Sequence, residues 1–150
     1  MKAPLIDIKE ILSAYSLMPE KTTFWVSKGV FQTPDFEVKT TLFRAGFHLV
    51  GLCISGTLEV RINFRDYTIR HNTFMAITPT TIVQVLSKSE DFRVRTILFD
   101  KDFLLQHSNN SRLLDTLGIF ENTGVTSFST TRAETEMLVP MFELIRAKYD

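Results

Sequence analysis

The segment HLVGLCISGTLEVRINFRDYTIRHNTFMAITP, residues 48–79, decides the fold class of this chain. Apolar and polar residues alternate over residues 57–64, and a period of two predicts a β-strand with one face on a core. The residues assigned to that core face are Leu58, Val60, Ile62 and Phe64. The preceding run, residues 49–54, is apolar and too short for most helices, so it predicts a second, buried strand.

Tight turns separate these strands from each other and from two more. Ser55-Gly56 joins the first two, and Gly56 supplies the positive φ that a hairpin turn demands. Residues 63–66 and 71–72 bound short strands at residues 67–69 and 74–77. Three close turns in about thirty residues predict a meander of antiparallel strands.

Similar patterns continue on both sides of this segment. Strands are predicted at residues 24–31, 36–43, 82–86 and 93–99. About eight closely spaced strands indicate a mainly β fold, either a sandwich or a barrel. Residues 5–15 have apolar side chains at helical spacing and predict a short N-terminal helix.

The pattern becomes helical beyond Asp100. Short helices are predicted at residues 101–107 and 112–117, with a strand at 125–128 after them. A long helix should begin at Thr131, because Thr131 and Glu134 have the spacing of a capping box. Pro140 lies inside this helix and predicts a kink or a fresh start.

The long helix carries two adjacent apolar stripes, together wider than packing on one barrel face requires. The stripe expected to pack on the barrel is Leu138, Phe142, Ile145 and Tyr149. The stripe expected to be exposed is Met137, Met141 and Leu144. Because an exposed apolar strip usually marks a partner surface, residues 131–150 are predicted to form a homodimer interface about a two-fold axis.

Composition limits the classes of partner. The 150 residues include 17 basic and 17 acidic ones, which predicts one domain without the charge footprint of nucleic-acid binding. No apolar run reaches the length of a membrane span, and charged residues interrupt the N-terminus where a signal peptide would be apolar. The single cysteine, Cys53, is expected to be a buried thiol in a reducing compartment, the cytoplasm.

No arrangement of residues typical of catalysis is present in the sequence. His48, His71 and His107 have no ligand spacing, and no Gly-rich phosphate loop, HExxH motif or nucleophile elbow occurs. The carboxylates are scattered over turns and polar strand faces. We therefore expect no catalytic residues, no metal and no cofactor.

The order of elements resembles the N-terminal sensing domain of AraC/XylS-type transcription regulators, a small cupin-like (jelly-roll) barrel followed by helices. Residues 43–48, FRAGFH, align with the strand entry of such domains, and Gly56, Tyr67 and Pro79 match its hairpin glycine, aromatic and proline. The resemblance implies an arm and helix at residues 1–20, the barrel at 21–100 and a helical dimerisation segment at 101–150. It also implies an effector-sensing domain whose DNA-binding helix-turn-helix units are expected beyond residue 150.

The same resemblance predicts a barrel without its metal. The cupin frame, laid on Gly56, places its two histidines at Phe43 and Ala45, its glutamate at Leu49 and its last histidine near residues 83–84. Phenyl, methyl and isobutyl groups cannot ligate a divalent metal. A metal-dependent activity is therefore not expected.

Alternation from these positions makes the barrel interior apolar. The candidates for an apolar ligand pocket are Phe43, Ala45, Phe47, Leu49 and Val83, with Trp25 at its edge. Arg44 and His48 have the opposite parity and should lie at the surface or between elements. An effector should be largely apolar with at most one polar end, because a buried unpaired polar group costs about 1–3 kcal/mol.

Other functions stay open at the level of the sequence. The candidate residues could form a packed core, so a ligand-free oligomerisation module fits the pattern as well as a sensor does. A stand-alone cupin enzyme would need metal donors or an acid–base pair. A cyclic-nucleotide-binding regulator would need a Gly-Glu phosphate cassette followed by an arginine, and the sequence contains none.

Overall fold

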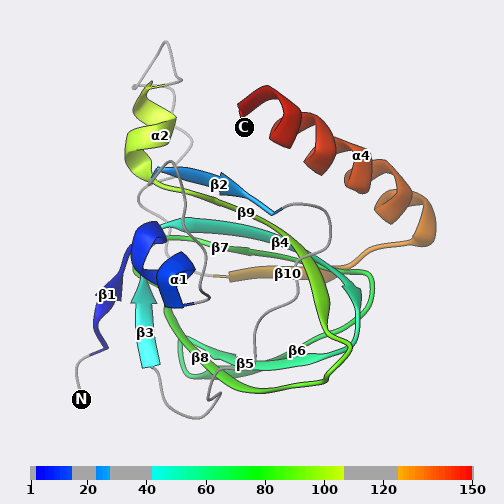
Figure 1. Ribbon diagram of the computed structural model, residues 1–150. Helices are drawn as coiled ribbons and strands as arrows, with labels where there is room; N and C mark the ends of the chain where they lie inside the picture. The colour runs from blue at the N-terminus through cyan, green and yellow to red at the C-terminus, as the bar shows by residue number, and fades with distance from the viewer. Residues whose placement is uncertain (1–2, 15–22, 28–41, 107–124, 150) are drawn as a thin grey trace.

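The computed structural model describes residues 3–14, 23–27, 42–106 and 125–149. Within these ranges the chain forms two five-stranded sheets with helices at their periphery (Figure 1). The elements in chain order are β1 Leu5–Ile6, α1 Ile8–Ala14, β2 Phe24–Val26, β3 Leu42–Ala45, β4 His48–Ser55, β5 Leu58–Ile62, β6 Arg65–Ile69, β7 Thr73–Ile77, β8 Ile82–Lys88, β9 Arg93–Phe99, α2 Lys101–Gln106, β10 Val125–Ser129 and α4 Arg132–Tyr149.

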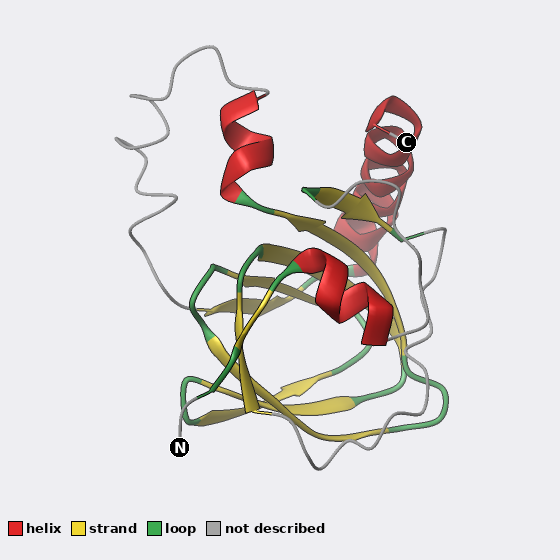
Figure 2. Cartoon of the chain, turned by 60° about the vertical axis from the view of Figure 1, so that its left-hand side comes forward, coloured by secondary structure: helices red, strands yellow, loops and turns green. Residues whose placement is uncertain are grey.

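The two sheets curve around a common interior. One has the strand order β1-β3-β8-β5-β6 and the other β10-β7-β4-β9-β2. Among the described pairings, β1 with β3 is parallel and the others are antiparallel. Helix α1 lies across one end of the interior, and α4 lies outside the second sheet (Figure 2). The prediction of a mainly β, antiparallel fold that ends in a long helix is confirmed.

The turn at Ser55-Gly56 does not form the predicted hairpin. β4 pairs with β7 and β9, whereas β5 pairs with β6 and β8, so the chain crosses between sheets at this turn. Residues 71–72 likewise carry the chain from β6 to β7 in the other sheet, and the predicted meander is wrong. The difference follows from burial: β4 is apolar on both faces and needs cover on both, whereas Glu59 and Arg61 give β5 a polar outer face.

Gly56 nevertheless has the predicted conformation. Its φ is 73°, and a Cβ at this position would lie 2.5 Å from the backbone nitrogen of Phe92. The turn therefore requires glycine both for its φ and for the close approach of the neighbouring chain.

The β5–β6 hairpin turns at Asn63 and Phe64, whose φ values are 49° and 69°. Two successive positive φ values in a two-residue loop are typical of a type I′ turn. The Phe64 side chain is 73% exposed, so its assignment to the core face is wrong. The alternation ends at Ile62 because the turn takes Phe64 out of the pleat of β5.

The N-terminal helix begins later than predicted. Leu5–Ile6 form β1, and the Gly46 N–H donates to the Ile6 carbonyl over 2.8 Å. Asp7 caps α1, because its carboxylate accepts the Glu10 N–H at 2.8 Å and the Glu10 carboxylate accepts the Asp7 N–H at 3.4 Å. A cap at Asp7 excludes Leu5 from the helix.

Other predicted elements lie partly outside the described residues. The strands expected at residues 24–31 and 36–43 are described only as β2 and β3, and the helix expected at 112–117 lies outside the description altogether. The predicted helix at residues 101–107 corresponds to α2. β10 adds a strand from beyond residue 100 to the sheet that contains β7.

Helix α4 begins with the predicted capping box. The Glu134 N–H donates to Thr131 Oγ1 at 3.1 Å, and the Thr131 N–H donates to Glu134 Oε1 at 2.9 Å. The hydrogen bond from the Thr131 N–H, together with the Thr131 side chain, stabilises the ionised carboxylate and lowers the pKa of Glu134. The helix continues through Pro140 as one element, so no second helix starts there.

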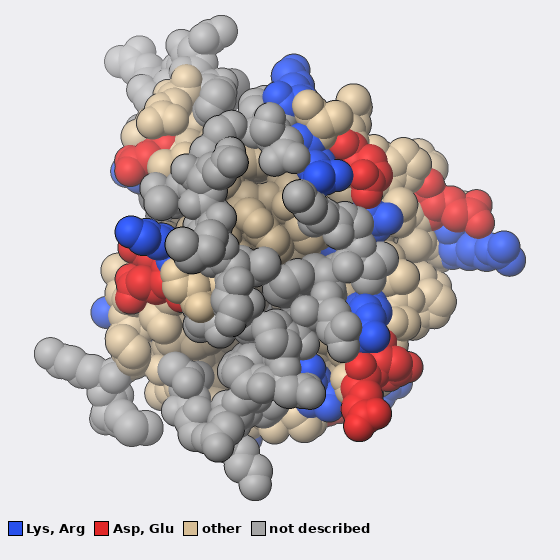
Figure 3. Space-filling view, viewed as in Figure 1, with Lys and Arg blue, Asp and Glu red and all other residues tan. Residues whose placement is uncertain are grey.

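Basic and acidic side chains are interspersed on the described part of the face in Figure 3, and no field of a single sign covers it. Within the described residues, no helix has both the length and the apolar character required to cross a membrane.

Candidate ligand-binding site

A cavity of about 140 Å³ lies between the two sheets. It extends from α1 at one end of the interior to the inner faces of β4, β5, β7, β8 and β9. Its described lining consists of Ile11, Leu12, Trp25, Phe43, Phe47, Leu49, Gly51, Cys53, Leu58, Val60, Ile69, Met75, Ile77, Val83, Phe92, Val94, Thr96 and Leu98. Protein interiors are close-packed and few voids exceed the size of a water molecule. A hollow of this volume distinguishes the interior from a filled core.

Strand alternation aims the lining residues inward. On β4, Leu49, Gly51 and Cys53 face the cavity. The residues between them, Val50 and Leu52, belong to the cluster on the opposite face of the sheet. One strand therefore contacts the cavity and the outer apolar layer at the same time.

The structure brings five of the six sequence-predicted pocket residues to the cavity: Phe43, Phe47, Leu49, Val83 and Trp25. Ala45 is placed outside the lining. It ends β3 and is buried in a cluster with Ile8, Leu12, Phe47 and Leu98, where α1 covers the end of the barrel. The role of these side chains as ligand contacts stays a prediction.

The sequence patterns did not identify the end of the cavity formed by α1. Ile11 and Leu12 close it, and no periodicity within the helix shows which strands it covers. The contribution of β9 could have been found. Val94, Thr96 and Leu98 share one parity along this strand and line the cavity, and Thr96 interrupts their apolar pattern.

The lining is neutral as well as apolar. No Asp, Glu, Lys, Arg or His belongs to the part of it that the structure describes. The Cys53 thiol donates to the Ser55 carbonyl oxygen at 3.3 Å, and burial raises the pKa of this thiol to about 11. Within the described ranges, no group of three or more His, Cys, Asp or Glu side chains could hold a metal ion.

Arg44 and His48, whose parity is opposite to that of the predicted pocket residues, lie outside the cavity, as expected. Arg44 is exposed, and its Nε donates to the Ala3 carbonyl oxygen at 3.3 Å. His48 is buried and stacks on Phe99, with ring centroids 4.8 Å apart. Burial lowers the pKa of His48, and its Nε2 has no partner among the described residues.

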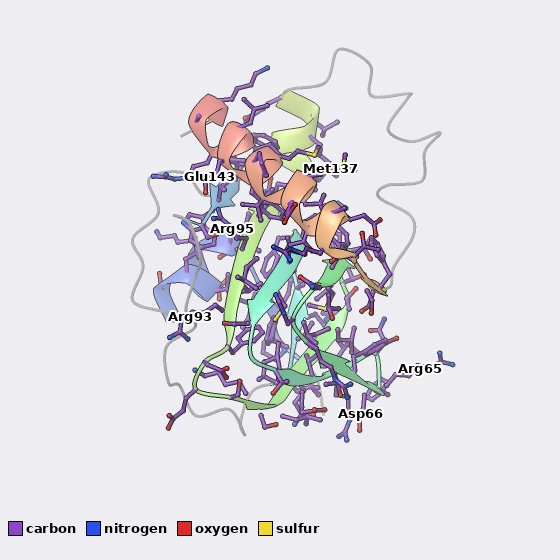
Figure 4. The ribbon with its side chains drawn as sticks, turned by 90° about the vertical axis from the view of Figure 1, so that its right-hand side faces the viewer. Arg65, Asp66, Arg93, Arg95, Met137 and Glu143 are labelled. Atoms are coloured by element: carbon purple, nitrogen blue, oxygen red, sulfur yellow. The ribbon has the colours of Figure 1, made fainter. Side chains whose placement is uncertain are left out.

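Helix α4 packs on the outer face of the sheet that walls the cavity. Phe142 is 5% exposed, and Leu138 and Ile145 pack in the same cluster, as the first apolar stripe predicts. Nothing is described of the Tyr149 side chain. Arg95 on β9 and Glu143 on α4 form an ion pair between the sheet and the helix (Figure 4).

The second apolar stripe of α4 points away from the sheet. Met137, Met141 and Leu144 are 70%, 54% and 69% exposed. Figure 4 labels Met137 on α4. The predicted division of α4 into a packed stripe and an exposed stripe is confirmed by these values, and the function of the exposed stripe stays a prediction.

An apolar cavity enclosed by two sheets, with a helix packed on the outside of one wall, defines a small-molecule-binding β domain. The chain matches the model of the AraC-like ligand binding domain over residues 35–147, and it belongs to this family. No curated protein sequence matches the chain.

Several solved structures resemble the chain. The structure of ToxT from Vibrio cholerae has a TM-score of 0.48 and 13% identity, and the match covers 80% of this chain and 47% of that one. An unsaturated-fatty-acid-bound ToxT gives a TM-score of 0.47 and 12% identity, covering 85% and 48%. The plu4264 protein from Photorhabdus luminescens is 20% identical over 67% and 66%, with a TM-score of 0.34. The chain thus spans just under half the length of ToxT, and its family assignment rests on the family model.

Proposed function

We propose that this chain is the cytoplasmic effector-sensing and dimerisation domain of an AraC-type transcription regulator, and that it has no catalytic activity and no metal. The observation that carries the proposal is the hollow, apolar interior of the barrel. A largely apolar molecule fits this lining, because polar groups buried without partners cost about 1–3 kcal/mol each. DNA would be bound by a helix-turn-helix region outside this chain, whose own charges balance.

The sheet that contains β9 connects the cavity with α4. On β9, Thr96 and Leu98 line the cavity, while Ile97 packs in the cluster that contains Phe142 of α4. Arg95, also on the outer side of β9, pairs with Glu143 of α4. A ligand that displaces the inner face of β9 therefore also displaces residues that hold α4.

Trp25 provides the test of ligand binding, because it lines the cavity and is the only tryptophan in the chain. Small apolar compounds should shift its fluorescence and raise the melting temperature, whereas monosaccharides should do neither. In Trp25→Phe the fluorescence response should disappear and the thermal shift should remain. A monosaccharide that shifts Trp25 emission and stabilises the chain would contradict the proposed effector class.

The exposed stripe of α4, Met137, Met141 and Leu144, is the proposed dimer surface. Apolar side chains with this exposure, aligned on one helix, favour burial against a partner. A two-fold axis would place the same stripe of a second copy against it, since an isologous interface uses one patch twice. Such symmetry suits a regulator that reads paired DNA half-sites.

Light scattering on Leu144→Asp tests this surface. The variant should be a folded monomer under conditions where the wild type is a dimer, because a buried unpaired carboxylate opposes association. Thr57→Asp places the same charge at an exposed position in the turn after β4 and should stay dimeric. A wild type that is monomeric at high micromolar concentration, or a Leu144→Asp that unfolds, would refute the assignment.

A further inference from the structure

One residue of the described cavity lining, Thr96, carries a hydroxyl group. Thr96 lies between Val94 and Leu98 on the inner face of β9. Ser27 fixes its backbone: the Thr96 N–H donates to Ser27 Oγ at 3.1 Å, and the Thr96 carbonyl accepts the Ser27 N–H at 3.0 Å. Its Oγ1 forms no hydrogen bond with any residue that the structure describes.

The neighbour of Thr96 on β4 has no side chain. The Cα partner of Thr96 across the sheet is Gly51 of β4, which has no side chain. Gly51 lines the cavity, and a Cβ added there would make ordinary contacts of 3.6 Å with side-chain atoms of Leu49 and Val94, so a methyl group would fit without a clash. Thr96 and Gly51 therefore lie side by side on the cavity wall.

The other two polar side chains of the described lining, Cys53 and Trp25, have interactions of their own. The Cys53 thiol donates to the Ser55 carbonyl oxygen, and its raised pKa keeps it protonated at neutral pH. Trp25 also has an interaction partner. Thr96 is thus the residue of the described lining whose side-chain hydroxyl has no hydrogen-bond partner among the described residues.

Size and charge restrict the ligand further. An engineered cavity of about 150 Å³ lined by Leu, Ile and Phe binds benzene, so 140 Å³ corresponds to roughly one ring with a small substituent. No charged side chain of the described lining could pair with an ionised group, and burying an unpaired charge is strongly unfavourable.

We propose that the effector is a neutral, compact molecule of about one ring, with a single hydroxyl or carbonyl group that hydrogen-bonds to Thr96. This inference rests on the proposed function, because it assumes that the cavity is the effector site. Thr96 would select among apolar molecules of similar size, and Gly51 would keep the approach to it open.

Cyclohexanol and methylcyclohexane are suitable probes, because they have nearly the same shape and differ in one hydroxyl. Binding is measured by the fluorescence of Trp25 and by calorimetry. Thr96→Val removes the hydroxyl at nearly constant volume. It should lower the affinity for cyclohexanol about tenfold, because it leaves the ligand hydroxyl without a partner. Affinity for methylcyclohexane should stay within about twofold, and Thr96→Ser should retain the wild-type preference.

Each other outcome overturns a defined part of the proposal. Equal effects of Thr96→Val on both ring probes would remove Thr96 from ligand selection and leave the cavity as the binding site. Tighter binding of cyclohexanecarboxylate than of cyclohexanol would refute a neutral ligand. Binding of 1-decanol without either ring compound would refute the compact size. No response to any probe would overturn both this inference and the proposed function.

Discussion

Replacement of Gly51 by alanine should stabilise the ligand-free domain and, at the same time, lower the affinity of the domain for a ligand in the cavity. Gly51 lies inside β4, where glycine is less favourable than alanine by about 0.5–1 kcal/mol. The added methyl would make ordinary contacts of 3.6 Å with Leu49 and Val94 and would bury about one carbon, worth about 0.8 kcal/mol. The sum, about 1–2 kcal/mol, corresponds to a rise in melting temperature of about 3–6 °C for a domain of this size.

The same methyl occupies space in a cavity of only 140 Å³. Overpacking typically costs 1–3 kcal/mol, so the affinity for a ring-sized ligand should fall by about tenfold or more. Differential scanning calorimetry measures the first effect, and titration followed by Trp25 fluorescence measures the second. Opposite signs of the two effects are specific to a hollow that the ligand fills.

Gly46→Ala is the matched control. A Cβ at this position would lie 2.9 Å from the backbone oxygen of Ile6, so the same chemical change should lower the melting temperature. A destabilised Gly51→Ala would refute the open space beside β4. A stabilised Gly51→Ala with unchanged ligand affinity would show that the ligand binds elsewhere.

Three further predictions concern single residues. The pKa of His48 is lowered by burial, so below about pH 6.5 the unfolded chain binds a proton that the folded chain resists. The free energy of unfolding should therefore fall with decreasing pH, and His48 can contribute at most about 1.4 kcal/mol per pH unit to this slope. In denaturant titrations, His48→Phe should make the slope shallower. An unchanged slope would exclude His48 as its source. Phe64→Gly should raise the free energy of unfolding by about 1–2 kcal/mol, because glycine adopts a φ of 69° without strain and Phe64 buries little surface. A lower free energy of unfolding in urea titrations would show that the Phe64 ring packs against the rest of the domain in solution. Cys53, with a thiol pKa of about 11, should react with iodoacetamide at pH 8 only as fast as the native chain opens, whereas the urea-unfolded chain should react at once; rapid native labelling would contradict its burial.

The positions of the strands could be predicted because their signal is local. Alternation over residues 57–64 and the apolar run at 49–54 correspond to β5 and β4, and the capping-box spacing gave the start of α4 within one residue. The partners of the strands could not be predicted in this way. Ser55-Gly56 has the composition of a hairpin turn, yet the pairing of β4 with β9 depends on residues about forty positions further along the chain. No local pattern distinguishes a turn within a sheet from a turn between two sheets.

The site was predictable to the same limited extent. Parity placed Phe43 of β3 and Leu49 of β4 in the interior, because every second residue of a strand faces the same side, but it failed for Ala45 at the end of β3. It could not decide between a packed core and a hollow. That difference depends on the volume left over when all inward side chains are summed, and here it includes Gly51 opposite Thr96 and the position of α1 over one end.

β9 contacts both the cavity and α4. Because alternate residues point to opposite faces, Thr96 and Leu98 reach the cavity while Arg95 and Ile97 reach α4. The backbone between them is a single extended chain, hydrogen-bonded to β4 on one side and to β2 on the other. It cannot move on its inner face alone. A ligand that shifts Thr96 must therefore shift the anchor of Glu143 or strain the two flanking strands. A sensor built on this sheet needs no hinge between its cavity and α4, because the wall of the cavity is also the surface on which α4 packs.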